Sequence, residues 1–112
     1  MTAEAAGKQG HFAPDKINAL MKEKGAAPTA YLIDSDGAVG RAYGAKTTPH
    51  MFVINPAGTI VYAGAIDDKR SARESDRKTA NNYVRAALNE ATAGKPVTVA
   101  NTTPYGCSVK YD

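Results

Sequence analysis

The sequence predicts an α/β fold class, and three observations carry that prediction. Met51–Ile54 is a continuous apolar run, as expected of a strand that is buried on both faces. Residues 55–58 have strong turn chemistry and residues 59–62 return as a second apolar stretch, which together predict an antiparallel hairpin. From residue 76 to residue 93, apolar side chains recur at helical spacing, which predicts a long amphipathic helix.

Two shorter helices are predicted ahead of the hairpin. Pro14 suits a first helical position, and the apolar side chains after it have helical spacing, so a helix is expected over residues 14–24. Residues 36–44 form a second helical pattern that ends at a glycine. Residues 31–33 lie between these helices and indicate a brief strand. With the strand at Met51–Ile54, this order predicts a short βαβ crossover.

The chain is expected to form one domain with less regular ends. Residues 1–13 show no periodicity, so we expect a flexible tail. Residues 14–96 contain all the predicted helices and the hairpin and form the domain. Residues 97–112 are expected to be a C-terminal extension, in which Val97 and Val99 alternate with polar residues.

The composition argues against several function classes. The 112 residues include 14 Lys and Arg against 11 Asp and Glu, and no Trp, so nucleic-acid binding is not expected. No apolar run approaches the ~20 residues that a membrane helix needs. His11 and His50 are the only histidines and Cys107 is the only cysteine, so we expect neither a metal site nor a cofactor nor an internal disulfide. The single cysteine and the lack of a signal sequence indicate a cytoplasmic location.

Residues 41–62, RAYGAKTTPHMFVINPAGTIVY, resemble the segment that carries the cis-proline in the redoxin family. This family is the alkyl hydroperoxide reductase and thiol-specific antioxidant group of peroxiredoxin-like proteins. The resemblance extends over residues 14–93, and Thr48-Pro49 is its most specific part. It implies a thioredoxin-like fold that is incomplete here, because family members carry a reactive cysteine ahead of this region and the sequence has no cysteine before Cys107.

The resemblance implies a substrate-binding site around the proline. Pro49 is expected to be cis, and the backbone of Thr48 is expected to pair with an extended substrate. The hydroxyl groups of Thr47 and Thr48 could orient a thiolate or a peroxide, although β-branched residues also suit the entry to a strand. His50 could assist proton transfer beside a reactive cysteine, or it could be a polar side chain at the end of a strand.

Cys107 is the candidate catalytic residue, as a resolving thiol that attacks an oxidised cysteine and closes a disulfide. The alternative is an unreactive surface thiol. Arg41 is a candidate for stabilising negative charge beside a reactive cysteine, and a solvated helix face explains it equally simply. Asp67 and Asp68 are interpreted as a solvated loop rather than as a pair of acid–base carboxylates.

These observations predict a portion of a thiol-dependent oxidoreductase, either a peroxiredoxin-like antioxidant or a thiol–disulfide reductase. Because the nucleophilic cysteine is missing, the chain by itself is expected to be inactive. The alternative is a non-catalytic thioredoxin-like module that binds an extended peptide or partner chain by strand addition. A thiol or disulfide partner protein fits the first function. A homodimer is also expected, since the resemblance implies two absent strands beside Met51–Ile54 and hence unpaired backbone groups there.

Overall fold

The computed structural model describes residues 12–70 and 73–111, in which irregular segments connect helices and short antiparallel strands. They belong to two compact units. The first contains the described residues up to Ala45 and residues 109–111, and the second runs from Lys46 to Ser108. The elements are, in order, α1 (Pro14–Glu23), α2 (Ala38–Tyr43), β1 (Thr47–Thr48), β2 (Met51–Ile54), β3 (Ile60–Gly64), α3 (Glu74–Thr79), α4 (Tyr83–Thr92) and β4 (Cys107–Ser108). The chain is therefore of the α/β class, as predicted.

The predicted hairpin is confirmed in the second unit. Strands β2 and β3 pair antiparallel, with Val53 opposite Tyr62. The turn between them closes through Asn55, whose side-chain oxygen accepts the backbone N–H of Thr59 at 2.9 Å. Gly58 completes the turn with a φ of +85°, a conformation that costs glycine little. The strands are short, so the hairpin needs a packed face to be stable.

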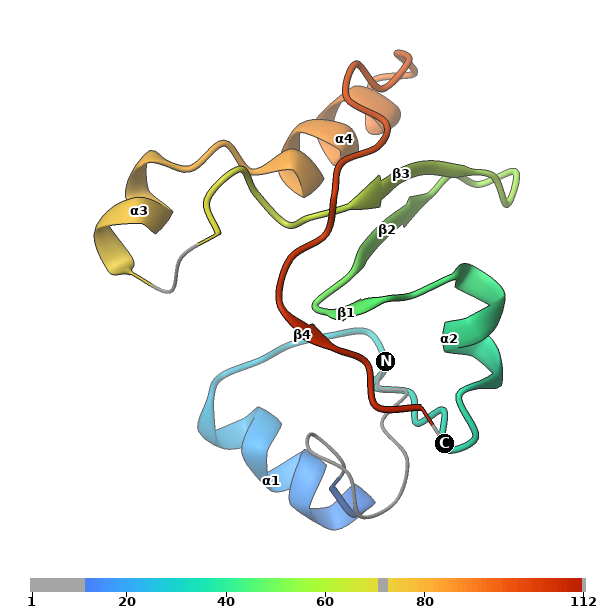
Figure 1. The fold of residues 1–112 in the computed structure, drawn as a ribbon, viewed down its shortest axis with the longest axis vertical. Coiled ribbons are helices and arrows are strands. Elements are labelled where there is room, and N and C mark those ends of the chain that lie inside the picture. The colour runs from blue at the N-terminus through green and yellow to red at the C-terminus, as the bar shows by residue number, and fades with distance from the viewer. Residues whose placement is uncertain (1–11, 71–72, 112) are drawn as a thin grey trace. The chain divides into compact units, whose positions relative to one another are not determined.

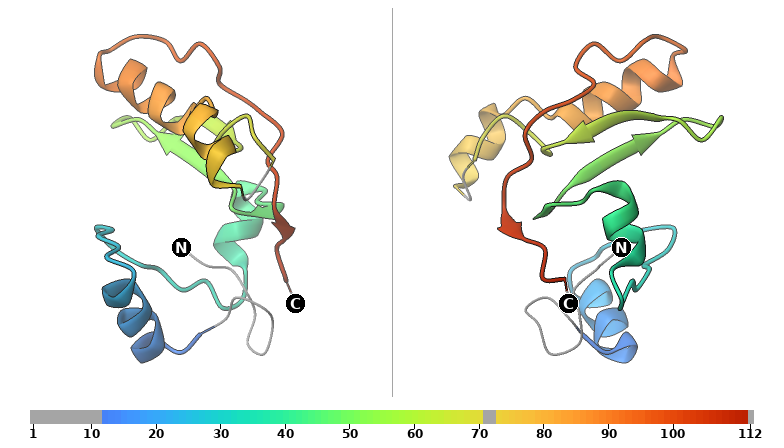
Figure 2. Two further views of the ribbon diagram at one scale, coloured as in Figure 1. Left: turned by 90° about the vertical axis from the view of Figure 1, so that its left-hand side faces the viewer. Right: turned by 45° about the vertical axis from the view of Figure 1, so that its right-hand side comes forward.

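Helix α4 supplies that packed face, lying across the hairpin as Figures 1 and 2 show. The buried cluster consists of Val53 from β2, Tyr62 from β3 and Ala87 from α4. Half-buried apolar side chains surround this cluster: Met51, Val61, Tyr83, Val84 and Val97. Burial of these side chains from three elements is what holds the second unit together.

The prediction of one long helix over residues 76–93 is wrong, because the chain forms α3 and α4 with a break at residues 80–82. The side-chain oxygen of Asn82 caps α4 by accepting the backbone N–H of Arg85 at 2.8 Å. Asn81 bonds to Asp68 instead of continuing the helix: the Asp68 carboxylate accepts both its backbone and its side-chain N–H groups. Asparagine favours caps and turns over helix interiors. The polar contacts of Asn81 and Asn82 therefore break the helix, although the apolar residues keep helical spacing on both sides of the break.

The first unit confirms both predicted short helices, α1 and α2. Ile17 on α1 is buried within this unit. The predicted strand at residues 31–33 is wrong: only Ile33 makes a single β-bridge, and all three residues are exposed. The predicted βαβ crossover is therefore not formed among the described residues, whose two sheets are both antiparallel. Three residues are too few to stand as a strand without a stable neighbour.

The C-terminal extension is largely irregular but well connected. In the second unit, β4 pairs antiparallel with β1, a contact that the sequence did not predict. Further back along the segment, Asn101 forms a parallel bridge with Ala63 of β3. The predicted tail over residues 1–13 lies outside the described residues, apart from residues 12 and 13. No helix in the described ranges is both long and apolar enough to cross a membrane.

Candidate functional site

The second unit brings four of the five predicted site residues into one loop and pairs the fifth with them. Thr47 and Thr48 form β1, and Pro49 and His50 connect it to β2. Thr48 lies directly opposite Cys107 in the antiparallel pairing of β1 with β4, and Thr47 lies opposite Ser108. Figure 1 shows these two short strands side by side. Residues 59 positions apart in the sequence therefore meet at one place.

The Thr48–Pro49 peptide bond is cis, as predicted. The loop that contains it is closed by the Thr47 hydroxyl, which donates to the carbonyl oxygen of Pro49 at 2.8 Å. Gly106 approaches this loop so closely that a β-carbon in its place would overlap the Thr48 carbonyl group. Gly106 also has a φ of +135°, so glycine is required on two grounds immediately before Cys107.

His50 is held by its surroundings at the other end of the loop. Its Nδ1 accepts the backbone N–H of Lys46 at 3.1 Å, so the neutral ring carries its proton on Nε2. Its ring stacks on Phe52, with centroids 4.5 Å apart. Burial, assisted by the positive charge of Lys46, lowers the pKa of His50 below its ordinary value. The lowered pKa favours the neutral ring, whose Nε2 N–H is then its hydrogen-bond donor.

Cys107 is exposed, and the backbone of the segment that carries it is fixed at several points. Thr102 is one of these points: its hydroxyl accepts the backbone N–H of Ala65 at 2.8 Å and lies 2.7 Å from the Tyr62 hydroxyl. The Tyr62 hydroxyl donates in turn to the carbonyl oxygen of Ala65. Since Thr102 has one hydroxyl proton, this chain is satisfied when Thr102 donates to Tyr62.

Sequence reasoning missed a second fixed point, the contact between Tyr105 and Asp67. The Tyr105 hydroxyl donates to Oδ1 of Asp67, and the Arg70 guanidinium lies 6.0 Å from the centre of the Tyr105 ring. Desolvation, together with the Asp67 hydrogen bond and charge, raises the pKa of Tyr105 to about 12. The hydroxyl therefore remains a donor at any physiological pH. The two residues are 38 positions apart, so no local pattern in the sequence could have revealed the contact.

The solvated loop that the sequence indicated is confirmed at Asp68, which is exposed, but not at Asp67. Asp67 is half-buried and bonded to Tyr105, while Asp68 holds Asn81 at the helix break. Hydrogen bonds from Asn81 lower the pKa of Asp68. Both carboxylates act as structural acceptors in the second unit.

Arg41 belongs to the first unit, where its contacts are structural. Its guanidinium donates to the carbonyl oxygen of Asp36 at 2.5 Å and lies 4.7 Å from the centre of the Tyr111 ring. The Tyr111 hydroxyl donates to the carbonyl oxygen of Ala45 at 2.8 Å. These contacts dock residues 109–111 on α2 and give the arginine a packing role.

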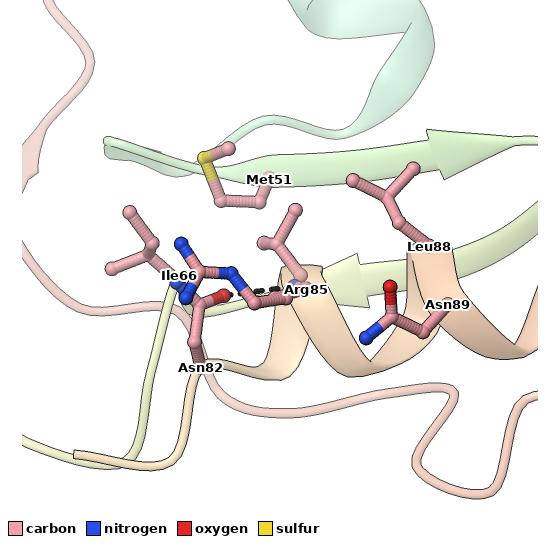
Figure 3. Close-up of a pocket in the computed structure, with 7 residues that line it drawn as sticks. Met51, Ile66, Asn82, Arg85, Leu88 and Asn89 are labelled. Carbon is pink, nitrogen blue, oxygen red and sulfur yellow. Dashed lines mark hydrogen bonds between the residues drawn. The ribbon is translucent and has the colours of Figure 1, made fainter.

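A shallow pocket of about 280 Å³ lies between α4 and the hairpin. Figure 3 shows Met51 above it on β2, Leu88 on α4, and Asn82 and Arg85 at the start of the helix. Its lining is mostly apolar, and no described group of three His, Cys, Asp or Glu side chains could hold a metal there or elsewhere. The pocket does not include any of the predicted site residues.

Two solved structures are similar to this chain. A hypothetical protein from Sinorhizobium meliloti 1021 matches 98% of the chain with a TM-score of 0.80 and 26% sequence identity. An uncharacterized conserved protein from Geobacillus kaustophilus matches 98% of it with the same TM-score and 27% identity. The chain spans only 58% and 57% of the lengths of these two structures. No family model matches the sequence, and no curated protein matches it.

Proposed function

We propose that this chain is part of a thioredoxin-like, thiol-dependent oxidoreductase in which Cys107 is the resolving thiol. The observation that carries the proposal is the direct pairing of Cys107 with Thr48, next to the cis peptide bond of Pro49. A thiol held there lies against the loop that the resemblance assigns to substrate binding. The greater length of the two similar structures supports the idea that the working protein contains more than these 112 residues.

The chemistry requires a second thiol, because Cys107 is the only cysteine in the sequence. A peroxide would oxidise that other thiol to a sulfenic acid. The Cys107 thiolate would then attack the sulfenic sulfur, so that a sulfur–sulfur bond forms, the sulfur–oxygen bond breaks and the hydroxide leaves as water with one proton. A thiol reductant would regenerate both cysteines by exchange. No cofactor takes part in these steps.

His50 and the loop can contribute to this reaction through groups that the geometry identifies. Nε2 of the neutral His50 ring carries an N–H that can donate a hydrogen bond to a leaving hydroxide or thiolate. The Thr47 hydroxyl is used within the loop, so its role is to hold the loop's shape. In this proposal the backbone around Thr48, and not the Thr47 hydroxyl, orients the substrate.

The test begins with the DNA upstream of the codon for Met1. We expect it to encode a cysteine. Treated with one equivalent of hydrogen peroxide, the extended chain should lose two hydrogen atoms (two protons and two electrons) as an intramolecular disulfide forms with Cys107. Cys107→Ser in the extended chain should instead give a dimedone-reactive sulfenic acid. An extended chain without a further cysteine would contradict the proposal. So would an extended chain whose peroxide oxidation product is unchanged by Cys107→Ser. The 112-residue chain alone should consume no peroxide beyond the rate of a free thiol.

The second candidate function is a non-catalytic module that binds an extended peptide by strand addition. The absence of any other cysteine from the sequence favours it. Cys107→Ser would leave peptide binding unchanged in that case, whereas an oxidoreductase would lose its disulfide. The same substitution therefore separates the two functions.

We also propose that the chain forms a homodimer and works in the cytoplasm. In the second unit β2 pairs with β3, and Ile54 at the end of β2 is 46% exposed. Contact between the β2 ends of two chains would bury this apolar side chain. Light scattering at tens of micromolar should give twice the mass of one chain, and a monomer with well-dispersed amide signals would contradict the dimer. A cytoplasmic location would keep the single thiol reduced.

A further inference from the structure

The segment from Asn101 to Ser108 crosses the second unit as a strap that ends in β4, which contains Cys107. Its contacts with the rest of this unit are unevenly spaced. Near its start, the backbone of residues 100–102 bonds to Ala63 on β3, at 3.0 and 3.2 Å. Near its end, β4 pairs with β1 over two residues. A pairing of two residues is too short to be stable without further support.

Tyr105 lies between these two points and makes the side-chain contact that can provide the support. It is half-buried, it lies two residues before Cys107, and its hydroxyl donates to Asp67. Asp67 is itself fixed, because it forms an antiparallel bridge with Asn82 at the start of α4. The contact therefore connects the strap to the helix and hairpin that form the core of this unit.

We propose that the Tyr105–Asp67 hydrogen bond positions Cys107 beside the cis-proline loop. Tyr105 is a positioning residue in this proposal: it does not touch the thiol, and it limits how far β4 can leave β1. The inference deepens the proposed function, since it matters for catalysis only if Cys107 is the resolving thiol. The position of the segment can be measured independently of that chemistry.

The measurement uses Thr48→Cys, which places a second thiol directly opposite Cys107. Opposed residues of an antiparallel pair have β-carbons ~4.5–5.5 Å apart, close to the separation that a disulfide spans. Because the sequence has no other cysteine, only one intramolecular disulfide can form in this variant. The equilibrium between this disulfide and a glutathione buffer gives the effective concentration of the Cys107 thiol at the thiol introduced at position 48.

In the Thr48→Cys background, Tyr105→Phe should lower that effective concentration by about fivefold, the effect of losing one hydrogen bond. Asp67→Ala should do the same, and combining the two should give no further loss. Asp67→Asn keeps an acceptor oxygen and should restore most of the value. The urea midpoint of each variant, measured in parallel, separates positioning from overall stability.

Tyr83→Phe is the matched control, because Tyr83 lies in the same unit with its ring 6.4 Å from that of Tyr62. It should leave the effective concentration unchanged even where it lowers the urea midpoint. An effective concentration that Tyr105→Phe leaves unchanged, or that falls equally with Tyr83→Phe, would overturn the proposal. Neither outcome would affect the peroxide test, so failure of the positioning and failure of the proposed function remain distinguishable.

Discussion

The two units hold their helices by different means. In the second unit, α4 packs on the hairpin around Tyr62, which is fully buried. In the first unit, a buried carboxylate caps a helix. Asp34 is 6% exposed and accepts the backbone N–H groups of Val39 and Gly40 at the start of α2. Apolar burial gives a free-energy gain that is insensitive to pH, whereas a charged cap depends on its ionisation. The two units should therefore respond differently to substitution and to acid.

Tyr62→Ala should have the largest effect and should be confined to the second unit. Loss of a fully buried aromatic side chain costs about 3–5 kcal/mol, enough to unfold a small unit. Tyr62→Phe keeps the ring and loses only the hydroxyl contacts with Ala65 and Thr102, so it should cost about 1–3 kcal/mol. Urea unfolding followed by amide signals of β2 and α1 would measure both units. If Tyr62→Ala destabilised α1 as much as β2, the two units would not be independent in stability.

Gly64→Ala should have the next largest effect. Gly64 has a φ of +151°, and a β-carbon there would lie about 2.5 Å from the carbonyl oxygen of Thr102, too close for any real contact. We expect a loss of about 2–3 kcal/mol, because the strap must move away from β3. Gly58→Ala is the control, since its φ is also positive but nothing lies within 4 Å. It should cost only about 1–2 kcal/mol, the strain of the backbone alone. Similar losses of unfolding free energy for the two variants would show that Thr102 moves away from a β-carbon at position 64 at little cost.

Acid should open the first unit selectively. The backbone N–H of Gly40, followed by that of Val39, lowers the pKa of Asp34 from its ordinary value of 3.8. Because the charged form is favoured in the folded state, its stabilisation is fully present above the ordinary pKa and is lost as the pH falls through the lowered one. An NMR titration should show the Gly40 amide signal moving below pH 3.8 while the Val53 signal stays. Movement of the Gly40 signal at or above the ordinary pKa would contradict the cap, and Asp34→Asn should remove the titration altogether.

Leu32→Ser should have the smallest effect. Leu32 is 56% exposed in the first unit, so its replacement should change the free energy of unfolding by no more than about 0.5 kcal/mol in a monomer. Ile54→Thr on β2 is the matched change in the second unit, at 46% exposure. Should the chain dimerise through β2, as we propose, only Ile54→Thr would weaken association in light scattering. A loss of association with Leu32→Ser would instead place the dimer contact in the first unit.

Local patterns predicted most of the fold, and contacts between distant residues account for what they missed. The hairpin, α1 and α2 depend on spacing and turn residues, which are properties of neighbours in the sequence. The break before α4 depends on Asp68 reaching Asn81, thirteen positions away, so the apolar spacing alone gave one helix instead of two. The strand at residues 31–33 failed for a different reason, since only Ile33 makes a β-bridge and the apolar run does not extend into a paired strand.

The candidate site shows the same division. The cis bond before Pro49 could be expected from the resemblance of the surrounding segment. The pairing of Cys107 with Thr48 and the contact of Tyr105 with Asp67 could not, because they depend on the path of an irregular segment. Gly106 is the one local signal that was available. A glycine directly before a cysteine allows close backbone approach, and here the approach is to Thr48.

The pairing of β4 with β1 limits how a peptide can bind at the loop. The edge of Thr48 that faces Cys107 is already occupied by the chain's own strand. An incoming peptide would have to displace a competitor that is tethered to the same molecule, and a short flexible tether keeps its end at an effective concentration on the order of millimolar. If the strap segment itself binds that edge with micromolar intrinsic affinity, an incoming peptide would appear about a thousandfold weaker. We therefore expect that only a tightly binding or covalently captured partner would displace the strap from this edge.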